Sequence, residues 1–309
     1  MVFIPTFHRI VLAMVVTASV LLGACNTVPS QTIPSTTTPT LPPAVAQPKR
    51  PPKVGLALGG GAARGFAHVG VILALEEAGI KVDMVAGTSA GSLVAAIYAS
   101  GKTGAQLQTV AEGMEEAAIS DWTLPFFGRG MLRGDALARY VNLQVNNKLV
   151  ESMTIPLGIV ATDLRTGQGV LFQRGDTGAA VRASSAVPSV FNPVKIGAAE
   201  YVDGGLVSPV PVRYARQMGA DVVIAVDISS APEGNLADNQ LQILLQTFAI
   251  MGKSINNFEL KDAELVVRPA LVGVKGGDFS AKRRAIDAGK LAMQQMVPQL
   301  RALIEAKTK

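Results

Sequence analysis

The chain has 309 residues, 49% of them apolar and 17% charged, which excludes a disordered chain and allows one large core or two modest ones. A single α/β domain is the simpler prediction. The formal charge of +5 would suit an anionic membrane or a nucleic acid. No basic block alternates with aromatic residues, which make up only 5% of the chain, so we predict no nucleic-acid partner.

Histidine and cysteine are scarce, and this limits the possible chemistry. Cys25 is the single cysteine, so neither a disulfide nor a paired-cysteine metal site can form within the chain. His8 and His68 are the two histidines. A Ser-His-Asp triad would have to use His68, because His8 lies in a segment that we expect to be removed.

Residues 1–24 have the pattern of a secretory signal, with Arg9 before an apolar stretch at 10–22 that is too short for the roughly 20 residues of a transmembrane helix. The sequence Leu-Gly-Ala-Cys that ends at Cys25 resembles the lipobox of bacterial lipoproteins. We therefore expect cleavage before Cys25, lipidation of its sulfur, and attachment to a membrane of the bacterial cell envelope. The alternatives are a secretory signal with an incidental cysteine and an uncleaved anchor. Asn26, which follows, favours the outer membrane.

A polar segment separates Cys25 from the first predicted strand. Residues 26–52 are rich in Pro, Thr, Ser and Gln and have no apolar periodicity. Such a segment buries too little apolar surface to offset the entropy lost on ordering. We predict a lipidated tether over residues 25–52 and a folded domain over residues 53–309.

The folded domain is predicted to begin with a buried strand at 54–58, a glycine-rich loop at 59–65 and a helix at 66–78. A Walker A loop is excluded because its lysine is missing, and a dinucleotide fingerprint would have a glycine where Arg64 stands. The remaining interpretations are a tight turn without a ligand and an oxyanion hole of backbone N–H groups ahead of a helix. The candidate donors are Gly60, Gly61, Ala62, Ala63, Arg64 and Gly65.

A Gly-Thr-Ser-Ala-Gly sequence at 87–91 lies between a predicted strand at 82–87 and a predicted helix at 92–100. A serine at a sharp strand-to-helix turn exposes its hydroxyl, and the small neighbours leave room for close backbone contact. Ser89 is therefore the candidate nucleophile. Both this turn and the glycine loop follow parallel strands, at the sheet edge where open α/β folds bind ligands.

Several later residues compete for roles beside Ser89. Asp203 lies in a Tyr-Val-Asp-Gly-Gly sequence, and Asp227 ends a predicted strand at 222–226, so the residues alone favour them equally as base. Asp163 precedes an Arg-Thr-Gly turn and is predicted to form an Asx turn. Ser184 and Ser185, in a helical run, lack flanking glycines and are predicted to pack or cap.

The remaining segments carry less chemistry. Residues 130–134, with Trp122, Phe126 and Phe127 upstream, form either a flap over an acyl groove or an ordinary buried corner. We predict a helix at 240–260, a strand at 264–268 and a basic amphipathic helix at 281–306 that is irregular at Pro298. Its basic residues lie on a solvated face or touch lipid headgroups: Lys282, Arg283 and Arg284.

Four sequence segments, in this order along residues 53–227, resemble the patatin-like phospholipases, particularly their bacterial members and the neuropathy-target-esterase-like lysophospholipases. They are GLALGGGAARGFAHVGVI at 55–72, AGTSAGSL at 86–93, the block at 182–188 with Phe191 and Pro193, and Tyr-Val-Asp-Gly-Gly at 201–205. The strand and turn at 160–167 also agree with the family. Many members have a fourth glycine where this chain has Ala62.

The resemblance implies a three-layer αβα fold with a mainly parallel central sheet and the serine on a nucleophile elbow. It also implies a Ser-Asp dyad in which Asp203 is the base of Ser89, His68 is structural, and no metal or cofactor takes part. The expected reaction is hydrolysis of fatty acyl esters of phospholipids or lysophospholipids. The alternatives are a general carboxylesterase or acyltransferase with the same dyad, and a non-catalytic envelope adaptor.

Overall fold

The computed structural model describes residues 50–121, 129–232 and 237–308. The predicted signal, Cys25 and the tether up to residue 49 lie outside these ranges, as do Trp122, Phe126 and Phe127. Within the described ranges, no helix has both the length and the apolar character needed to cross a membrane.

The central sheet has eight strands in the order β10-β9-β1-β2-β4-β8-β7, and β5 also pairs with β4. The first five run parallel: β10 (Leu265–Val267), β9 (Val222–Val226), β1 (Val54–Leu58), β2 (Met84–Thr88) and β4 (Leu157–Asp163). Three strands extend the sheet in antiparallel pairs: β8 (Ala199–Asp203), β7 (Val194–Ile196) and β5 (Gly169–Phe172). A separate parallel pair joins β3 (Gly130–Leu132) to β6 (Ser189–Phe191).

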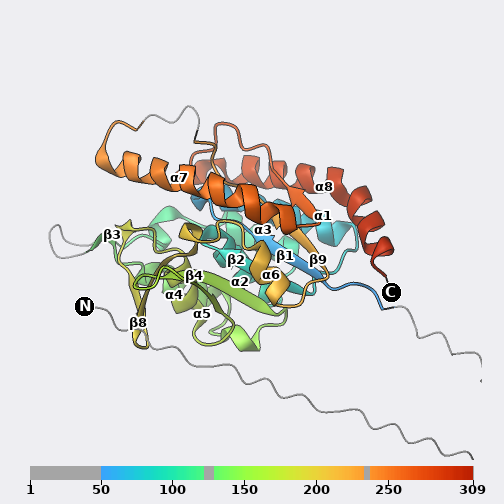
Figure 1. Ribbon diagram of the computed structural model, residues 1–309, viewed down its shortest axis with the longest axis horizontal. Coiled ribbons are helices and arrows are strands. Elements are labelled where there is room, and N and C mark those ends of the chain that lie inside the picture. The colour runs from blue at the N-terminus through green and yellow to red at the C-terminus, as the bar shows by residue number, and fades with distance from the viewer. Residues whose placement is uncertain (1–49, 122–128, 233–236, 309) are drawn as a thin grey trace, which may run out of the picture. The chain divides into compact units, whose positions relative to one another are not determined.

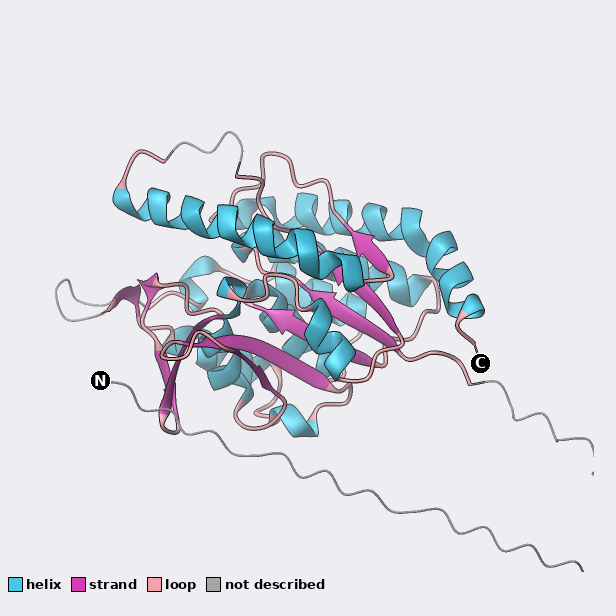
Figure 2. Cartoon of the chain, in the orientation of Figure 1, coloured by secondary structure: helices cyan, strands magenta, loops and turns pink. Residues whose placement is uncertain are grey.

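Helices cover both faces of this sheet (Figures 1 and 2). They are α1 (Phe66–Glu77), α2 (Ala90–Ala99), α3 (Gly104–Glu112), α4 (Asp135–Gln144), α5 (Thr177–Ser184), α6 (Val212–Gln217), α7 (Gln240–Glu259) and α8 (Lys282–Ala306). Side chains alternate along each strand. Leu56 and Leu58 of β1 pack into the larger core with α1, α2 and α8, whereas Ala57 packs with α6. The three-layer, mainly parallel αβα fold expected from the resemblance is confirmed.

Helices α1 and α8 are in direct backbone contact through two glycines. A Cβ on Gly70 would lie 1.8 Å from the Ile286 carbonyl oxygen, and one on Gly289 would lie 1.9 Å from the Ala67 carbonyl oxygen. Only glycine permits so close an approach. Helix α8, from the end of the chain, is therefore part of the support for α1, which directly follows the glycine loop.

The predicted strands at 54–58 and 222–226 have the predicted bounds, and the helices predicted at 66–78 and 240–260 match α1 and α7 within one residue. Pro298 lies inside α8 without ending it. Helices α3, α4 and α6 and the antiparallel strands were not among the predicted elements.

Candidate active site

Ser89 lies at a strained turn between β2 and α2, with φ 52° and ψ −125°. Positive φ is rare in residues other than glycine, and holding such a conformation costs about 1–3 kcal/mol. The glycines on either side permit the turn, since a Cβ on Gly87 would lie 2.5 Å from the Gly91 carbonyl oxygen and one on Gly91 would lie 2.1 Å from that of Leu58. The turn therefore has the geometry of a nucleophile elbow.

Asp203 at the end of β8 is the hydrogen-bond acceptor of the serine. Ser89 Oγ donates to Asp203 Oδ2 at 2.7 Å, and the Gly205 N–H donates to Oδ1 at 2.7 Å. The Asp203 residue is only 6% exposed. Burial raises the pKa of Asp203 to about 6, and the hydrogen bonds from Ser89 and Gly205 oppose this rise only in part. A carboxylate with this pKa is a better proton acceptor than an exposed aspartate.

Ser184 positions the elbow rather than competing with Ser89. Its buried hydroxyl donates to the Val160 carbonyl oxygen at 2.5 Å and accepts from the Ser89 N–H at 2.9 Å. These two bonds join β4 to the turn after β2. The structural role predicted for Ser184 is confirmed. Its neighbour Ser185 lines the pocket beside Ser89.

The glycine loop follows β1 and lies directly against the elbow, since a Cβ built on Gly60 would be 3.2 Å from Ser89 Cβ. Several of its backbone N–H groups already have acceptors. Gly60 donates to Pro209 O at 2.9 Å, Ala63 to Gly276 O at 2.8 Å, and Arg64 to Gly61 O at 3.1 Å.

Three of the six predicted oxyanion donors are therefore excluded, because the N–H groups of Gly60, Ala63 and Arg64 already have acceptors. Within the described part of the chain, the N–H groups of Gly61 and Ala62 have no acceptor. Gly65 ends the 3-10 turn Ala62–Gly65 and packs on α2. Ala62 has φ 51°, a left-handed conformation that glycine adopts with less strain.

Three long-range bonds hold the Arg64 side chain. Its guanidinium donates to Ile228 O at 2.6 Å, to Ser229 O at 2.9 Å and to Val274 O at 3.3 Å. These acceptors belong to the segments after β9 and before α8. Arg64 thus fixes the glycine loop to a distant part of the chain.

His68 is fully buried in α1, the helix that follows the glycine loop. Its Nε2 hydrogen-bonds to Gly59 O at 2.8 Å. Because a carbonyl oxygen only accepts, the proton of the neutral ring is on Nε2. Burial lowers the pKa of His68 to about 4, so the ring is neutral at physiological pH. These contacts are those of a structural residue.

The two other candidate aspartates form turns and ion pairs away from Ser89. Asp163 Oδ1 accepts from the N–H groups of Arg165 and Thr166, which is the predicted Asx turn. The Asp227 carboxylate accepts from Ser229 and pairs with Arg268 at 3.3 Å. Asp203 is therefore the aspartate that the fold brings to the serine.

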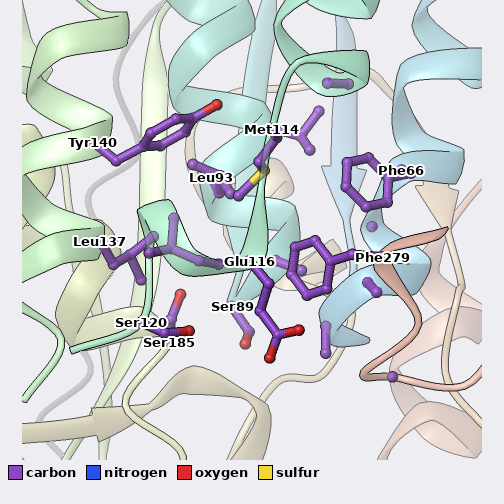
Figure 3. A pocket seen from close by; sticks show the side chains of 18 of the residues that line it. Phe66, Ser89, Leu93, Met114, Glu116, Ser120, Leu137, Tyr140, Ser185 and Phe279 are labelled. Atoms are coloured by element: carbon purple, nitrogen blue, oxygen red, sulfur yellow. The ribbon is translucent and has the colours of Figure 1, made fainter. Parts of the chain in front are cut away.

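Ser89 is one of the residues that line a pocket of about 290 Å³ (Figure 3). Most of its lining is apolar and includes Phe66, Leu93, Met114, Leu137 and Phe279. Strands β3 and β6 contribute Leu132 and Phe191, so the described part of the predicted aromatic segment does border the site. Among the described residues, no group of three His, Cys, Asp or Glu side chains is placed to hold a metal ion.

Comparison with known proteins places this arrangement in a family. The family model of the patatin-like phospholipases matches residues 56–216, more than half of the chain. The chain belongs to the patatin-like phospholipase family. The matched range contains the glycine loop, the elbow and Asp203, whereas α7 and α8 lie beyond it.

Curated relatives in this family include an uncharacterized NTE family protein of Mycobacterium tuberculosis, 35% identical over 204 residues that are 66% of this chain and 56% of that protein. Patatin-like phospholipase domain-containing protein 6 of Homo sapiens is 35% identical over 193 residues, 60% of this chain and 14% of that protein. The chain thus matches little more than half of the mycobacterial relative and a small part of the human one.

Among solved structures, VipD from Legionella pneumophila has a similar fold. The TM-score is 0.57 at 15% sequence identity, and the alignment covers 81% of this chain and 67% of that chain. At this level of identity the similarity concerns the fold alone.

Proposed function

We propose that the protein is a serine acyl hydrolase that cleaves fatty acyl esters of phospholipids or lysophospholipids by a Ser-Asp dyad. The observation that carries this proposal is the 2.7 Å hydrogen bond from Ser89 Oγ, which lines an apolar pocket, to the buried Asp203 carboxylate. Family membership supports the reaction class, and the apolar lining suits an acyl chain.

In the first half-reaction, Ser89 Oγ attacks the ester carbonyl carbon while its proton moves to Asp203 Oδ2. The carbonyl oxygen becomes an oxyanion, for which the free N–H groups of Gly61 and Ala62 and the N-terminus of α2 are the nearby donors. The carbon–oxygen bond to the alcohol then breaks, and the proton on Asp203 passes to the departing alcohol. An acyl-serine remains.

In the second half-reaction, Asp203 accepts a proton from water, whose oxygen attacks the acyl carbon. Collapse of the new oxyanion releases the fatty acid and returns the proton to Ser89. The pKa of Asp203, near 6, lets it hold a proton transiently and still be ionised at neutral pH. Both half-reactions use only groups of this chain, the substrate and water.

The test measures lipid products formed from a defined phospholipid mixture by the wild-type protein and by Ser89→Ala. The wild-type protein is expected to release free fatty acid and to react with an organophosphonate probe, and Ser89→Ala is expected to do neither. Asp203→Asn should lower kcat by roughly 10²- to 10⁴-fold. The proposal would be overturned if the wild-type protein released no fatty acid from any phospholipid, lysophospholipid or short ester and did not react with the probe. That result would favour a non-catalytic envelope adaptor.

His68→Gln separates the dyad from a triad. Because His68 bonds to Gly59 and not to Ser89, the variant should keep its activity within about tenfold. A folded but inactive His68→Gln protein would refute the dyad. Acyl transfer to added lipid alcohols would assign the acyltransferase alternative instead of a pure hydrolase.

We further propose that the domain is held on a membrane of the bacterial cell envelope by lipid on Cys25, with residues 25–52 as a tether. The position of Cys25 after the apolar stretch at 10–22 supports this. Cys25→Ser should release the protein from membranes and leave its activity on soluble esters intact. Continued membrane association of Cys25→Ser would contradict the lipid anchor.

A further inference from the structure

The pocket beside Ser89 is almost free of charged side chains. Among its described lining residues, Glu116 is the one acidic side chain, and no lysine or arginine is present. Apart from Glu116, its polar side chains carry hydroxyl groups: Ser89, Ser120, Tyr140 and Ser185. The segment 122–128, which lies outside the described residues, contains no ionisable residue in its sequence. A substrate in this pocket therefore meets the charge of Glu116 in addition to that of Asp203 behind Ser89, and no positive charge among the described lining residues.

Glu116 lies at the polar end of the pocket. It begins the 3-10 turn Glu116–Ala118 that follows α3. Figure 3 shows its carboxylate directed toward the end of the pocket that holds Ser89, Ser120 and Ser185, whereas Phe66 and Tyr140 lie at the other end. Among the described residues, no hydrogen bond or ion pair involves the Glu116 carboxylate.

The neighbouring charges do not neutralise Glu116. Lys282 of α8 donates to the carbonyl oxygens of Glu112 and Met114 and lies 4.0 Å from the Glu115 carboxylate. Arg283 lies 3.9 Å from the Glu112 carboxylate. These two cations thus lie beside Glu112 and Glu115, and neither is paired with Glu116.

We propose that Glu116 selects substrates by charge: it favours esters whose leaving alcohol ends in an ammonium group and disfavours those whose alcohol part is net anionic. This inference rests on the proposed hydrolase function, because it assigns the substrate class of the same site. The apolar end takes the acyl chain, which leaves the alcohol part beside Ser89 and Glu116. An anionic headgroup there is repelled, and no cation of the lining offsets the repulsion.

The test compares two monomeric substrates with the same acyl chain, lysophosphatidylcholine and lysophosphatidylglycerol, below their micelle concentrations. The ratio of kcat/KM values should favour the choline lipid in the wild-type protein. Glu116→Gln should reduce this ratio by roughly threefold to thirtyfold, the effect of removing one partly screened charge at the protein surface. The effect should shrink as salt is added.

Glu115→Gln is the matched control. It removes the same charge from the neighbouring residue, whose side chain is not among the residues that line the pocket. It should leave the ratio unchanged. An equal change in both variants would show a general surface potential and overturn the role of Glu116, as would an unchanged ratio in Glu116→Gln.

A binding measurement keeps this inference separate from the hydrolase proposal. Calorimetry on Ser89→Ala compares dodecyltrimethylammonium with dodecanoate, which share a chain and differ in charge. Tighter binding of the cation, reduced when Glu116→Gln is added, supports charge selection even if the wild-type protein hydrolyses neither lipid. Equal binding of the two amphiphiles, or binding of neither, overturns it.

Discussion

Two turns at neighbouring strand ends differ in what holds them. The elbow after β2 and the glycine loop after β1 each contain a non-glycine residue at positive φ, Ser89 at 52° and Ala62 at 51°. The elbow is fixed by close backbone contacts among Gly87, Gly91 and Leu58. The loop is fixed by hydrogen bonds from Arg64 and its neighbours to carbonyl groups far away in the sequence.

The two turns thus illustrate two ways of fixing a backbone, close packing in the elbow and long-range hydrogen bonds in the loop. The proposed nucleophile, Ser89, is placed by backbone packing that does not tolerate an added carbon atom, together with the hydrogen bond from its N–H to Ser184. The proposed oxyanion donors are placed by a network of bonds from a charged side chain, in which losing one bond loosens the loop without unfolding the domain. Substitutions in the elbow should therefore lower mainly the free energy of unfolding, and substitutions in the loop should lower mainly kcat.

Gly91→Ala should have the largest effect. Its Cβ would lie 2.1 Å from Leu58 O and 2.7 Å from Gly59 O, and both are backbone atoms that cannot rotate away. We expect the free energy of unfolding to fall by about 3 kcal/mol or more. Denaturant unfolding measures this. The control is Gly113→Ala, whose Cβ has only an ordinary 3.5 Å contact and whose φ is −80°; similar losses in both variants would contradict packing as the cause.

The Asp203 carboxyl should make stability depend on pH. Its pKa rises from 3.8 to about 6 on folding because burial disfavours the charge. Ionisation of Asp203 therefore lowers the free energy of unfolding. The loss is absent below about pH 4 and reaches about 3 kcal/mol above about pH 6, because each pKa unit corresponds to about 1.36 kcal/mol.

Asp203→Asn removes this cost. The variant should gain stability relative to the wild-type protein as pH rises from 4 to 7, and unfolding curves at several pH values measure the difference. If the difference in free energy of unfolding between the variant and the wild-type protein did not change with pH, the raised pKa of Asp203 would be contradicted. In the wild-type protein, kcat/KM should decline below about pH 6 as the base is protonated.

Arg64→Ala should lower the rate with a smaller effect on stability. Its three bonds to Ile228, Ser229 and Val274 would be lost, and the glycine loop would no longer be tied to these distant segments. We expect kcat to fall roughly tenfold to a hundredfold, with KM little changed because the acyl pocket remains. Arg268→Ala, which breaks only the pair with Asp227, is the control. A change confined to KM would contradict this role.

Ala62→Gly should have the smallest effect. Glycine relieves the strain of φ 51°, worth about 1–2 kcal/mol, but costs up to about 1 kcal/mol in unfolded-state entropy. The melting temperature should rise by no more than about 4 °C, with activity retained. A clear fall in melting temperature would show that the Ala62 methyl group makes favourable contacts that outweigh its strain.

Sequence predicted those parts of the site that are locally encoded. The strand before each turn is a continuous apolar run, and the glycines around Ser89 mark a tight turn, so β1, β2 and the elbow were found. Helix α3 was missed although it has a local signal, the capping box of Thr103 and Gln106.

The occupied N–H groups of the loop could not be predicted, because their acceptors, Pro209 and Gly276, are joined to it only by the fold. The same holds for Ser184, which reaches Ser89 across β4. Glu116 could not be distinguished from its neighbours Glu112 and Glu115 by sequence, since only the direction of its side chain sets it apart.

The anchors of the glycine loop also impose an order of assembly. The partner carbonyls of Arg64, at Ile228 and Val274, follow it by 164 and 210 positions in the chain. A nascent chain that already carries Ser89 still lacks the bonds that set the loop. The ribosome must therefore add the chain as far as Val274 before all three bonds of Arg64 can form, so the glycine loop is among the last parts of the site to be fixed.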